Sequence, residues 1–551
     1  MQSLDIRETG PGPIISHMCK QLEVRETIND VVSWDEKQCL LDPGTHVEAL
    51  IINILCQRDP LYRVKNFYLE QDVELLFGKG VKADYFNDDA LGSTLDKIYA
   101  ANPKKVFSAV ALKAQLKEDI NCRVLHGDTT ARLMYGAYEQ DEGLNVTYGY
   151  NKEHRKDLKQ FKIGLVVTEE GFPVLGETLD GNLDDKTWNK QLLQNLPEHF
   201  NLEELKKIIY VADSALVTED NLRAMGDTLQ FISHLPGFFN LASELTQAAF
   251  IKDSWEEIGK ISPGKKSASY KIQEFKKELY GRQYRFLVVH SDHLDKRKLR
   301  GLDSRLKKQR IELEKAATKL MKLEFACEPD AKDALLRFLK DHKNDFYPLS
   351  GSVEEIQEKV KRKNPGRPTK DEKPEYNSLY KVSLQVGELD EKAYEQEKEH
   401  LSCFVLISNI FHGYSGDEIL REYKKQSVVE NRFKFVKHPL YVGPLWLRKN
   451  ERLEAMSYVI LMALAVYIIL QRRVRRALKE EDEPLKLTGD KKSFEPTGNK
   501  ILELFKLVKI VYIKEDSTVK RFLPERYCLE LGRALRMIGF EMDIFTKPRA
   551  P

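Results

Sequence analysis

The sequence predicts an α/β protein whose central sheet is interrupted along the chain by a long inserted segment. Apolar residues recur at spacings of three and four from residue 14 to about 118, which is typical of helices that bury one face. From residue 120 the spacing changes to two, as in strands. A buried-strand pattern returns at 401–410 after a charged stretch. Because one short strand cannot stand alone, we expect it to complete the earlier sheet.

The composition narrows the possible classes of protein. A chain of 551 residues is too long for one compact core and predicts several domains. The 88 Lys and Arg residues nearly balance the 86 Asp and Glu residues, for a net charge of +2, so a face that binds nucleic acid would need local segregation of charge. The seven Cys residues form no C-x-x-C pair, which argues against a zinc module or a disulfide scaffold and favours a reducing cytosol.

No membrane attachment is predicted. The N-terminal residues lack a basic segment followed by an apolar one, so we expect no signal peptide. The apolar run at 456–470 has fifteen residues and is followed by a basic segment. It is shorter than the roughly 20 residues that a bilayer needs. We therefore predict a buried core helix and a cytoplasmic protein.

These patterns divide the chain into five regions. In order, they are a helical N-terminal domain, the first part of the sheet domain, an insertion, the second part of the sheet domain and a C-terminal region, at 1–118, 119–250, 251–398, 399–478 and 479–551. The insertion reads as mixed, with a strand at 284–292 and a highly charged helix at 296–324. The C-terminal region reads as a charged linker followed by a small helical or mixed end.

The elements of the sheet domain follow from the same periods. Strands are predicted at 122–130, 131–139 and 145–150, followed by a hairpin over 161–179 that turns at 169–171. Thr218 precedes two acids, which is typical of a helix N-cap. Two further helices are predicted at 416–437 and 450–478.

Two acids occupy matching places in predicted strands. Asp128 stands at the tip of the pattern that begins at Cys122, and Asp213 ends a run of four apolar residues. An Asp at a strand end is commonly a turn residue or a helix cap. The other interpretation is a metal ligand, which requires partners elsewhere in the chain.

A third acid, Glu430, lies on the predicted helix at 416–437. This helix opens with the capping box of Ser415 and Glu418 and stops before Pro439. Glu430 shares one predicted stripe with Ile419, Tyr423, Gln426, Phe433 and Lys437. We expect the stripe to face the sheet, where an unpaired carboxylate would be costly. The alternative is a surface pair with Lys434, four residues further on.

Three such carboxylates are what a two-magnesium site for phosphoryl transfer needs. Hard oxygen ligands hold Mg²⁺ and leave positions for water and phosphate. Two ions about 4 Å apart can activate the attacking oxygen and stabilise the leaving one. Because like charges repel without metal, we expect the ions to order the site.

On these residues, the sequence resembles the DDE transposases of bacterial and archaeal insertion sequences. The branch concerned carries Y-x₂-R-x₃-E-x₆-K around its third acid, matched here by Tyr423, Gln426, Glu430 and Lys437. Gln426 replaces the usual Arg, a departure that affects the phosphate or DNA contact of that Arg and not the metal site. The segments HGDTT (126–130) and YVADSALVTEDNL (210–222) match the first two acidic motifs. The resemblance covers about 120–240 and 400–475 and extends weakly to the N-terminus.

The resemblance implies a ribonuclease-H-like fold, in which a mixed sheet flanked by helices carries the first two acids and a helix behind a long insertion carries the third. It implies that Asp128, Asp213 and Glu430 are catalytic and hold two Mg²⁺ ions, with Mn²⁺ able to substitute. The long interval before Glu430 matches transposases whose insertion is mainly β. The N-terminal domain would bind the ends of the element.

Several basic residues are candidate DNA contacts. By resemblance, Tyr423 and Lys437 steady a DNA or hairpin phosphate, and Arg432 and Lys434 lie on the same helix. The helix after Asp295 carries a basic block that includes Arg297 and Arg300 and could neutralise several phosphates, or could be a solvated face. The segment KRKNPGRPTK (361–370) indicates a flexible linker more than a minor-groove hook. The segment QRRVRRALK (471–479) could meet DNA or cap its helix, and Trp188 is expected in the core.

The resulting functional prediction is an insertion-sequence transposase. It would bind the terminal inverted repeats of its element, cleave a phosphodiester at each end and join the freed 3′-hydroxyl to target DNA. A homodimer on paired ends and a prokaryotic, nucleoid-associated location are expected. The rivals are a ribonuclease-H-like nuclease without strand transfer and a domesticated or decayed copy that binds DNA without cutting it.

Overall fold

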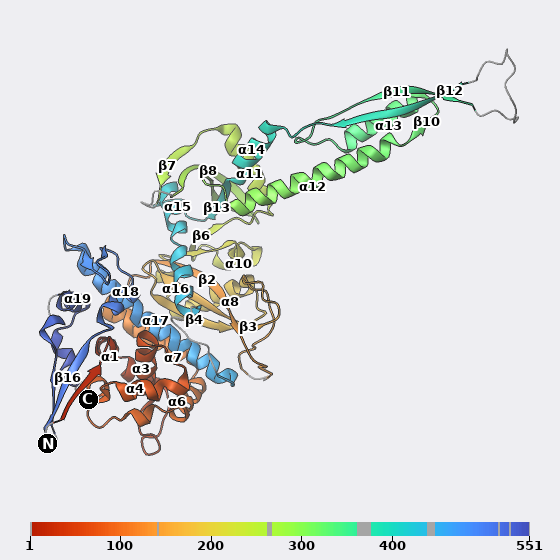
Figure 1. The fold of residues 1–551 in the computed structure, drawn as a ribbon. Coiled ribbons are helices and arrows are strands. Elements are labelled where there is room, and N and C mark those ends of the chain that lie inside the picture. The colour runs from red at the N-terminus through yellow and green to blue at the C-terminus, as the bar shows by residue number, and fades with distance from the viewer. Residues whose placement is uncertain are drawn as a thin grey trace, which may run out of the picture. The chain divides into compact units, whose positions relative to one another are not determined.

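The computed structural model describes residues 3–139, 143–261, 267–360, 376–437, 447–515, 518–527 and 530–549 (Figure 1). The chain folds as two compact units. Unit 1 combines Met1–His234 with Ser408–Pro551, and unit 2 is Leu235–Ile407. The sequence patterns assign residues 235–250 and 399–407 to the sheet domain. In the structure these residues belong to unit 2, because their contacts are mainly with the inserted elements.

Unit 1 begins with a strand and a group of helices. The strand is β1 (Ser3–Glu8), and the helices are α1 (Gly12–Gln21), α2 (Val24–Val31), α3 (Pro43–Cys56), α4 (Val64–Glu70), α5 (Val73–Phe77), α6 (Asp88–Ala100) and α7 (Pro103–Glu118), with 3-10 turns η1 (Leu61–Arg63) and η2 (Ala83–Phe86). The side chains of Asp42, Asn87 and Asn102 accept backbone N–H bonds at the starts of α3, α6 and α7. Such caps satisfy N–H groups that have no partner within the helix. The predicted helical character of 14–118 is confirmed.

Helix α17 (Asn450–Lys479) is the core helix of unit 1. It packs against α3, α6 and α7 and against strand β4 (Pro173–Leu179) of the sheet. By length and composition it could cross a membrane, but 89% of its most apolar window is buried inside the structure. This burial confirms the prediction of a buried core helix for the apolar run at 456–470.

The sheet of unit 1 is mixed. Its strands are β2 (Val124–Met134), β3 (Lys159–Thr168), β4 (Pro173–Leu179), β5 (Ile209–Ala212) and β6 (Gln230–His234), in the order β4-β3-β2-β5-β6. Strands β2, β3 and β4 pair antiparallel, whereas β2, β5 and β6 run parallel. The prediction of a mixed sheet flanked by helices is confirmed at this level of description.

Helices cover this sheet on either side. They are α8 (Asp185–His199), α9 (Leu202–Leu205), α10 (Glu219–Met225), α15 (Gly416–Lys424) and α16 (Ser427–Lys437), with the 3-10 turn η3 (Ser214–Leu216) after β5. Trp188 of α8 is 1% exposed and contacts Gly164 of β3, where a Cβ atom would lie 2.4 Å from the indole nitrogen. The core assignment of Trp188 is confirmed, and so is Thr218 as the N-cap of α10.

Three predicted elements of the sheet domain are corrected. The strands expected at 122–130 and 131–139 are one strand, β2, because β3 pairs with it from Leu125 to Met134. The strand expected at 145–150 is only an isolated bridge between Thr147 and Gln160. The helix expected at 416–437 is broken between α15 and α16. The hairpin is confirmed, with Gly171 at φ +86° in its turn, a conformation that glycine adopts without strain.

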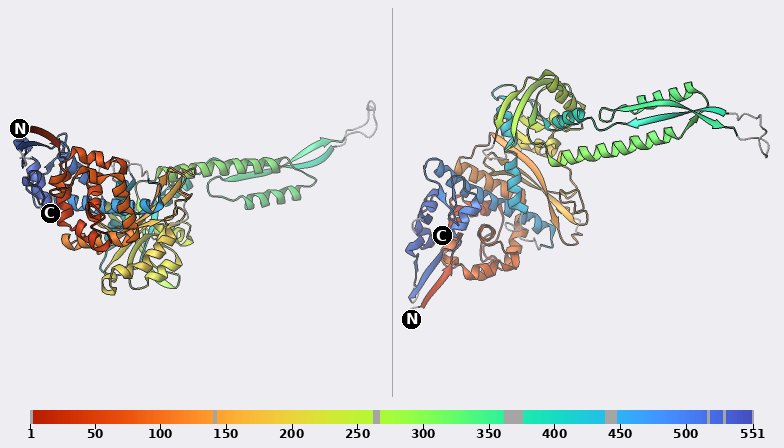
Figure 2. Two further views of the ribbon diagram at one scale, coloured as in Figure 1. Left: turned by 90° about the horizontal axis from the view of Figure 1, so that it is seen from below. Right: turned by 45° about the horizontal axis from the view of Figure 1, so that its top comes forward.

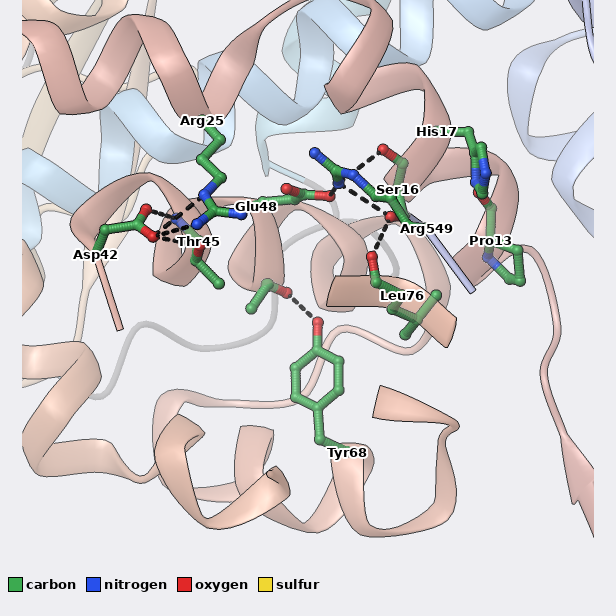
Figure 3. A network of polar contacts seen from close by, with 11 residues as sticks. Pro13, Ser16, His17, Arg25, Asp42, Thr45, Glu48, Tyr68, Leu76 and Arg549 are labelled. Atoms are coloured by element: carbon green, nitrogen blue, oxygen red, sulfur yellow. Dashed lines mark hydrogen bonds and ion pairs between the residues drawn. The ribbon is translucent and has the colours of Figure 1, made fainter. Parts of the chain in front are cut away.

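The C-terminal region returns to the N-terminal helices. It contains β14 (Leu485–Lys486), β15 (Lys492–Ser493), α18 (Gly498–Phe505), β16 (Lys509–Glu515), β17 (Thr518–Phe522), η4 (Glu525–Tyr527), α19 (Glu530–Ile538) and η5 (Met542–Phe545). Strand β16 pairs antiparallel with β1 and with β17, so strands from the N-terminal and C-terminal regions of the chain lie side by side in one small sheet (Figure 2). Near the last residue, Arg549 reaches Glu48 and Ser16 inside the helical group (Figure 3).

Unit 2 mixes helices and strands. Its elements are α11 (Asn240–Lys252), β7 (Glu256–Lys260), β8 (Ser269–Leu279), β9 (Arg282–Ser291), α12 (Lys296–Met321), β10 (Glu324–Phe325), α13 (Glu328–Asp341), β11 (Leu349–Lys359), β12 (Tyr376–Val386), α14 (Glu391–Leu401) and β13 (Cys403–Ser408, whose last residue belongs to unit 1). Helices α12 and α13 pack on the long hairpin of β11 and β12 through Ala317, Leu335, Phe338 and Leu384. The insertion therefore has the mixed helix and strand content that its residues predicted. It is not mainly β, as the resemblance implied.

Candidate active site

The register of two parallel strands places Asp128 next to Asp213. Strands β2 and β5 pair from Val124 with Ile209 up to Gly127 with Ala212, and Asp128 and Asp213 are the residues that come next along the chain. Asp128 therefore lies inside β2 and not at its tip, because β3 continues to pair with β2 beyond it. Asp213 follows directly after β5, whose four residues are all buried. The register brings together two acids that are 85 positions apart in the sequence.

Both acids also make local hydrogen bonds. Asp213 Oδ1 accepts the Ala215 N–H at 3.0 Å and so caps the turn η3. Asp128 Oδ1 accepts the Thr129 N–H at 2.7 Å. Asp213 is thus the helix cap that one interpretation of the sequence predicted. It could also be a metal ligand, because a carboxylate has about four acceptor positions.

The surroundings of these two acids disfavour negative charge. Burial raises the pKa of Asp128 to about 7, and the charge of Asp213 adds to this effect, whereas Lys152 opposes it. Burial also raises the pKa of Asp213, with Asp185 adding to it. Removing a carboxylate from water and placing it beside a like charge both favour its protonated form. A divalent cation bound between them would relieve this cost, so the oxygen-only pair suits Mg²⁺.

Glu430 approaches from helix α16 but is exposed, which corrects the expectation of a buried position. The chain leaves the helical path at Lys425 and Gln426, so residues before and after this break do not share one continuous stripe. On α16 the buried apolar residues are Val429, Phe433, Phe435 and Val436. Glu430 therefore lies at the border of the packed face.

Tyr423 links the three acids electrostatically. Burial raises the pKa of the Tyr423 hydroxyl to about 12, and the charges of Asp213, Glu430 and Asp128 contribute in that order. All three acids thus lie within electrostatic reach of one side chain. Within the described ranges, however, no three His, Cys, Asp or Glu side chains are close enough to hold a metal ion. The acids converge on one region without forming a closed ligand set, and their catalytic role stays a prediction.

Gln426 occupies the break between α15 and α16 and fastens it to β2. Its amide nitrogen Nε2 donates to the Gly127 carbonyl at 2.9 Å, and its Oε1 lies 3.2 Å from His126 Nδ1. The buried His126 also lies 3.6 Å from Glu422 Oε1. Gln426, which stands where the resembling family has Arg, therefore bonds to the residue preceding Asp128 and positions the two helices against the strand.

Replacing Gln426 with Ala is expected to destabilise unit 1. Loss of both hydrogen bonds leaves partly buried polar groups without partners, which should cost about 1–2 kcal/mol. Urea denaturation of the parent and the variant measures this difference. Ser427→Ala is the matched control, because Ser427 is exposed and should change stability by less than about 0.5 kcal/mol. Equal stability of the Gln426 variant and the parent would show that the contact does not hold the break.

The structure adds two residues that the sequence analysis did not select. Asp185, at the start of α8, accepts the Thr129 hydroxyl at 2.5 Å and Lys162 Nζ at 3.1 Å, and its charge acts on both Asp128 and Asp213. Lys152, in the segment before β3, acts on the same two acids with the opposite sign. The sequence contains no pattern that marks either residue, because both act on the acids through contacts between segments that lie far apart in the chain.

The candidate DNA contacts around α16 differ in exposure. Lys434 is exposed and bonds Asn431 at 2.8 Å. Arg432 is half-buried, and its Nη2 donates to the Glu170 carbonyl at 3.2 Å. Burial lowers the pKa of Arg432 to about 10. Arg432 therefore packs in part against the hairpin turn, and its role as a DNA contact stays a prediction. The side chain of Lys437 lies outside the described residues.

The other basic segments are also partly engaged within the protein. In unit 2, Arg297 and Arg300 are exposed on α12, whereas Arg305 pairs with Glu397 and Arg310 with Glu388. At the end of α17, Arg472, Arg473 and Arg475 donate hydrogen bonds to other groups of unit 1. This segment therefore stabilises unit 1 more than it provides positive charge for DNA. The predicted linker at 361–370 lies outside the described residues.

Comparison with known proteins identifies a matching family and similar solved structures. Residues 5–112 match a family described as a domain of unknown function (DUF4277). A similar solved structure is the cryo-EM structure of a piggyBac transposase synaptic complex with hairpin DNA, with a TM-score of 0.37 and 9% identity over 90% of this chain and 80% of that chain. No curated protein matches the sequence.

Proposed function

We propose that this protein is a DNA transposase of the DDE type with a ribonuclease-H-like catalytic domain. The observation that carries the proposal is that Asp128 lies in β2 and Asp213 directly follows the neighbouring parallel strand β5, with Glu430 and Tyr423 on the segment that follows unit 2. A mixed sheet that bears two acids, and a helix behind an inserted unit that bears the third, is the arrangement that the sequence resemblance implies.

Asp128, Asp213 and Glu430 would hold two Mg²⁺ ions, with Mn²⁺ able to substitute. When bound, such ions activate the attacking oxygen and stabilise the leaving oxygen of a phosphodiester. The Tyr423 hydroxyl, whose pKa is raised to about 12, stays protonated near neutral pH and can donate a hydrogen bond to a phosphate oxygen. Lys152 supplies positive charge beside the acids, and the exposed Lys434 supplies it on α16. These residues would orient the DNA strand at the acids.

The substrate would be the terminal inverted repeats of the protein's own element, followed by target DNA. Cleavage at each end frees a 3′-hydroxyl, and the same site would join that hydroxyl to the target. Because two ends must be joined in one event, a homodimer on paired ends is part of the proposal.

A DNA cleavage assay tests this function. A labelled fragment carrying the sequence that flanks the gene is incubated with the parent protein and with Glu430→Gln, in Mg²⁺ and in Mn²⁺. We expect the parent to cut at a defined end and to form joined products with added target DNA, and the variant to do neither. The variant removes one charge from an exposed position, so its fold should be unaffected.

Two other results would replace the proposal. Cutting without joined products would identify a ribonuclease-H-like nuclease without strand transfer. Binding of the fragment without cutting in either metal would identify a DNA-binding copy that has lost cleavage activity. The exposed position of Glu430 makes this second alternative the one to test first.

A further inference from the structure

Two tyrosines in the segment between β2 and β3 expose their rings to solvent. Tyr148 is 57% exposed and Tyr150 is 76% exposed. Single exposed apolar residues are normal on protein surfaces, but these two flank one glycine and are followed by Lys152 and Lys156. Between and after these lysines stand Glu153, His154 and the ion pair of Arg155 with Asp157. Aromatic rings interleaved with positive charge are the surface that proteins use to bind single-stranded nucleic acid.

The segment that carries these tyrosines is firmly held. Thr147 and Gln160 exchange two backbone hydrogen bonds, at 3.0 and 2.8 Å. The buried Gln160 side chain donates from Nε2 to the Tyr150 carbonyl at 3.1 Å and to the Gly181 carbonyl at 2.7 Å. The backbone at Gly149 packs so closely that a Cβ there would lie 2.2 Å from the Gly181 oxygen. The two rings therefore project from a fixed backbone.

One residue of this segment lies within electrostatic reach of the two strand acids. Lys152 comes two residues after Tyr150, and its charge acts on both Asp128 and Asp213. Gly181, which contacts Gln160 and Gly149, opens the stretch that leads to Asp185, whose carboxylate bonds to Thr129 beside Asp128. The charge of Lys152 and the stretch from Gly181 to Asp185 thus both connect the segment that carries the tyrosines to the same two acids.

The neighbouring charges favour nucleic acid over a protein partner. The cores of protein–protein interfaces are depleted of Lys, whereas Lys152 and Lys156 are exposed beside the tyrosines. Together with Glu153 and the paired Arg155 and Asp157, they leave this stretch a net charge of +1. A phosphate backbone would be attracted to these charges, and every base offers a face on which an aromatic ring can stack. In a duplex these faces are covered by neighbouring base pairs, so stacking on tyrosine requires unpaired bases.

We propose that Tyr148 and Tyr150 form a stacking platform for unpaired bases of the DNA strand whose phosphodiester lies at Asp128 and Asp213. This inference rests on the proposed function and specifies which form of DNA the site would bind. The protein binds DNA ends that are frayed, flipped out or hairpinned more tightly than continuous duplex.

The test compares an intact duplex of the flanking sequence with the same duplex frayed at one end by non-complementary bases. Binding is measured in Ca²⁺, a hard cation that takes the same oxygen ligands as Mg²⁺. The variants are Tyr148→Ala with Tyr150→Ala, and Tyr148→Phe with Tyr150→Phe, which keeps both rings. Tyr62→Ala is the matched control, because Tyr62 is also an exposed tyrosine, at 55%. A 2-aminopurine in the frayed strand reports stacking by loss of its fluorescence.

We expect the double Ala variant to bind the frayed duplex at least about 10-fold more weakly than the parent, because base–aromatic stacking contributes at this level. Binding to the intact duplex should change by less than about 3-fold, since that binding is mainly electrostatic. The Phe pair and the Tyr62 variant should resemble the parent, and quenching of 2-aminopurine should disappear only in the Ala pair.

Three results would overturn the platform. Equal binding of the Ala pair and the parent to the frayed duplex, while the parent binds and cuts DNA, would reject the platform alone. A changed oligomeric state of the Ala pair with unchanged DNA binding would assign the tyrosines to a subunit contact. Failure of the parent to bind either duplex would reject the proposed function and the platform together.

Discussion

Replacing Asp128 with Asn is expected to abolish DNA cleavage and, in the absence of metal, to make the protein more stable. An Asn cannot supply the charged ligand, and loss of an essential site group lowers rates by about 1,000-fold or more. The same change removes a carboxylate whose charged form is disfavoured by burial and by Asp213. Active sites commonly hold such costly groups, which is why their removal can stabilise a protein.

The pH dependence of this stabilisation has a definite sign. The pKa of Asp128 is raised from the ordinary 3.8 to about 7 in the folded protein, so between these values the folded state binds more protons than the unfolded state. The contribution of Asp128 to stability is fully present below pH 3.8, is lost as the pH rises, and is gone above about pH 7. The variant should therefore equal the parent near pH 4 and exceed it near pH 8, by on the order of 4 kcal/mol.

Urea denaturation in EDTA at the two pH values measures this effect, and addition of Mg²⁺ should then stabilise the parent and not the variant. Asp220→Asn is the matched control. Its carboxylate pairs with Lys190, which lowers the pKa of Asp220, so its removal should not stabilise the protein at high pH. Equal stability of parent and Asp128 variant at both pH values would show that the Asp128 carboxylate is not under electrostatic strain.

The second large effect is expected at the other end of unit 1, where Arg549 pairs with Glu48 (Figure 3). Glu48 is 1% exposed, and Arg549 also donates to the Ser16 carbonyl and hydroxyl, at 3.3 and 3.2 Å. Replacing Arg549 with Met would leave a buried carboxylate without its partner. Breaking a buried ion pair in this way typically costs about 3–5 kcal/mol.

The loss should depend on pH. Burial raises the pKa of Glu48 to about 7, and Arg549 counteracts that rise. Without Arg549 the folded pKa rises further, so Glu48 binds a proton more readily in the folded state. The Arg549 variant should be least stable near pH 8 and should recover part of the loss near pH 5, where Glu48 can be protonated.

Urea denaturation of three variants separates the causes. Combining Arg549→Met with Glu48→Gln should restore part of the stability at pH 8, because no unpaired charge remains. Lys547→Met is the control, since Lys547 is 77% exposed in its pair with Asp543 and such surface pairs contribute about 0–1 kcal/mol. A loss for Arg549→Met no greater than for Lys547→Met would mean that the C-terminal residues do not secure the helical group.

The elements of this protein that depend on local periodicity could be predicted from the sequence. The apolar spacing of 14–118 predicted the helices, the run at 456–470 predicted a buried helix, and Thr218 predicted the start of α10. In each case the signal lies within a few residues of the element, because helix hydrogen bonds and caps join near neighbours in the chain.

The arrangement around the acids depended on contacts between distant residues. The extension of β2 past Asp128 follows from its pairing with β3, and the break before Glu430 coincides with the bond from Gln426 to Gly127. The sequence could mark Asp128, Asp213 and Glu430 as acids in suitable elements. Their common environment, together with Asp185 and Lys152, is created by strand register and side-chain packing, which join residues far apart in the chain and leave no periodic trace in it.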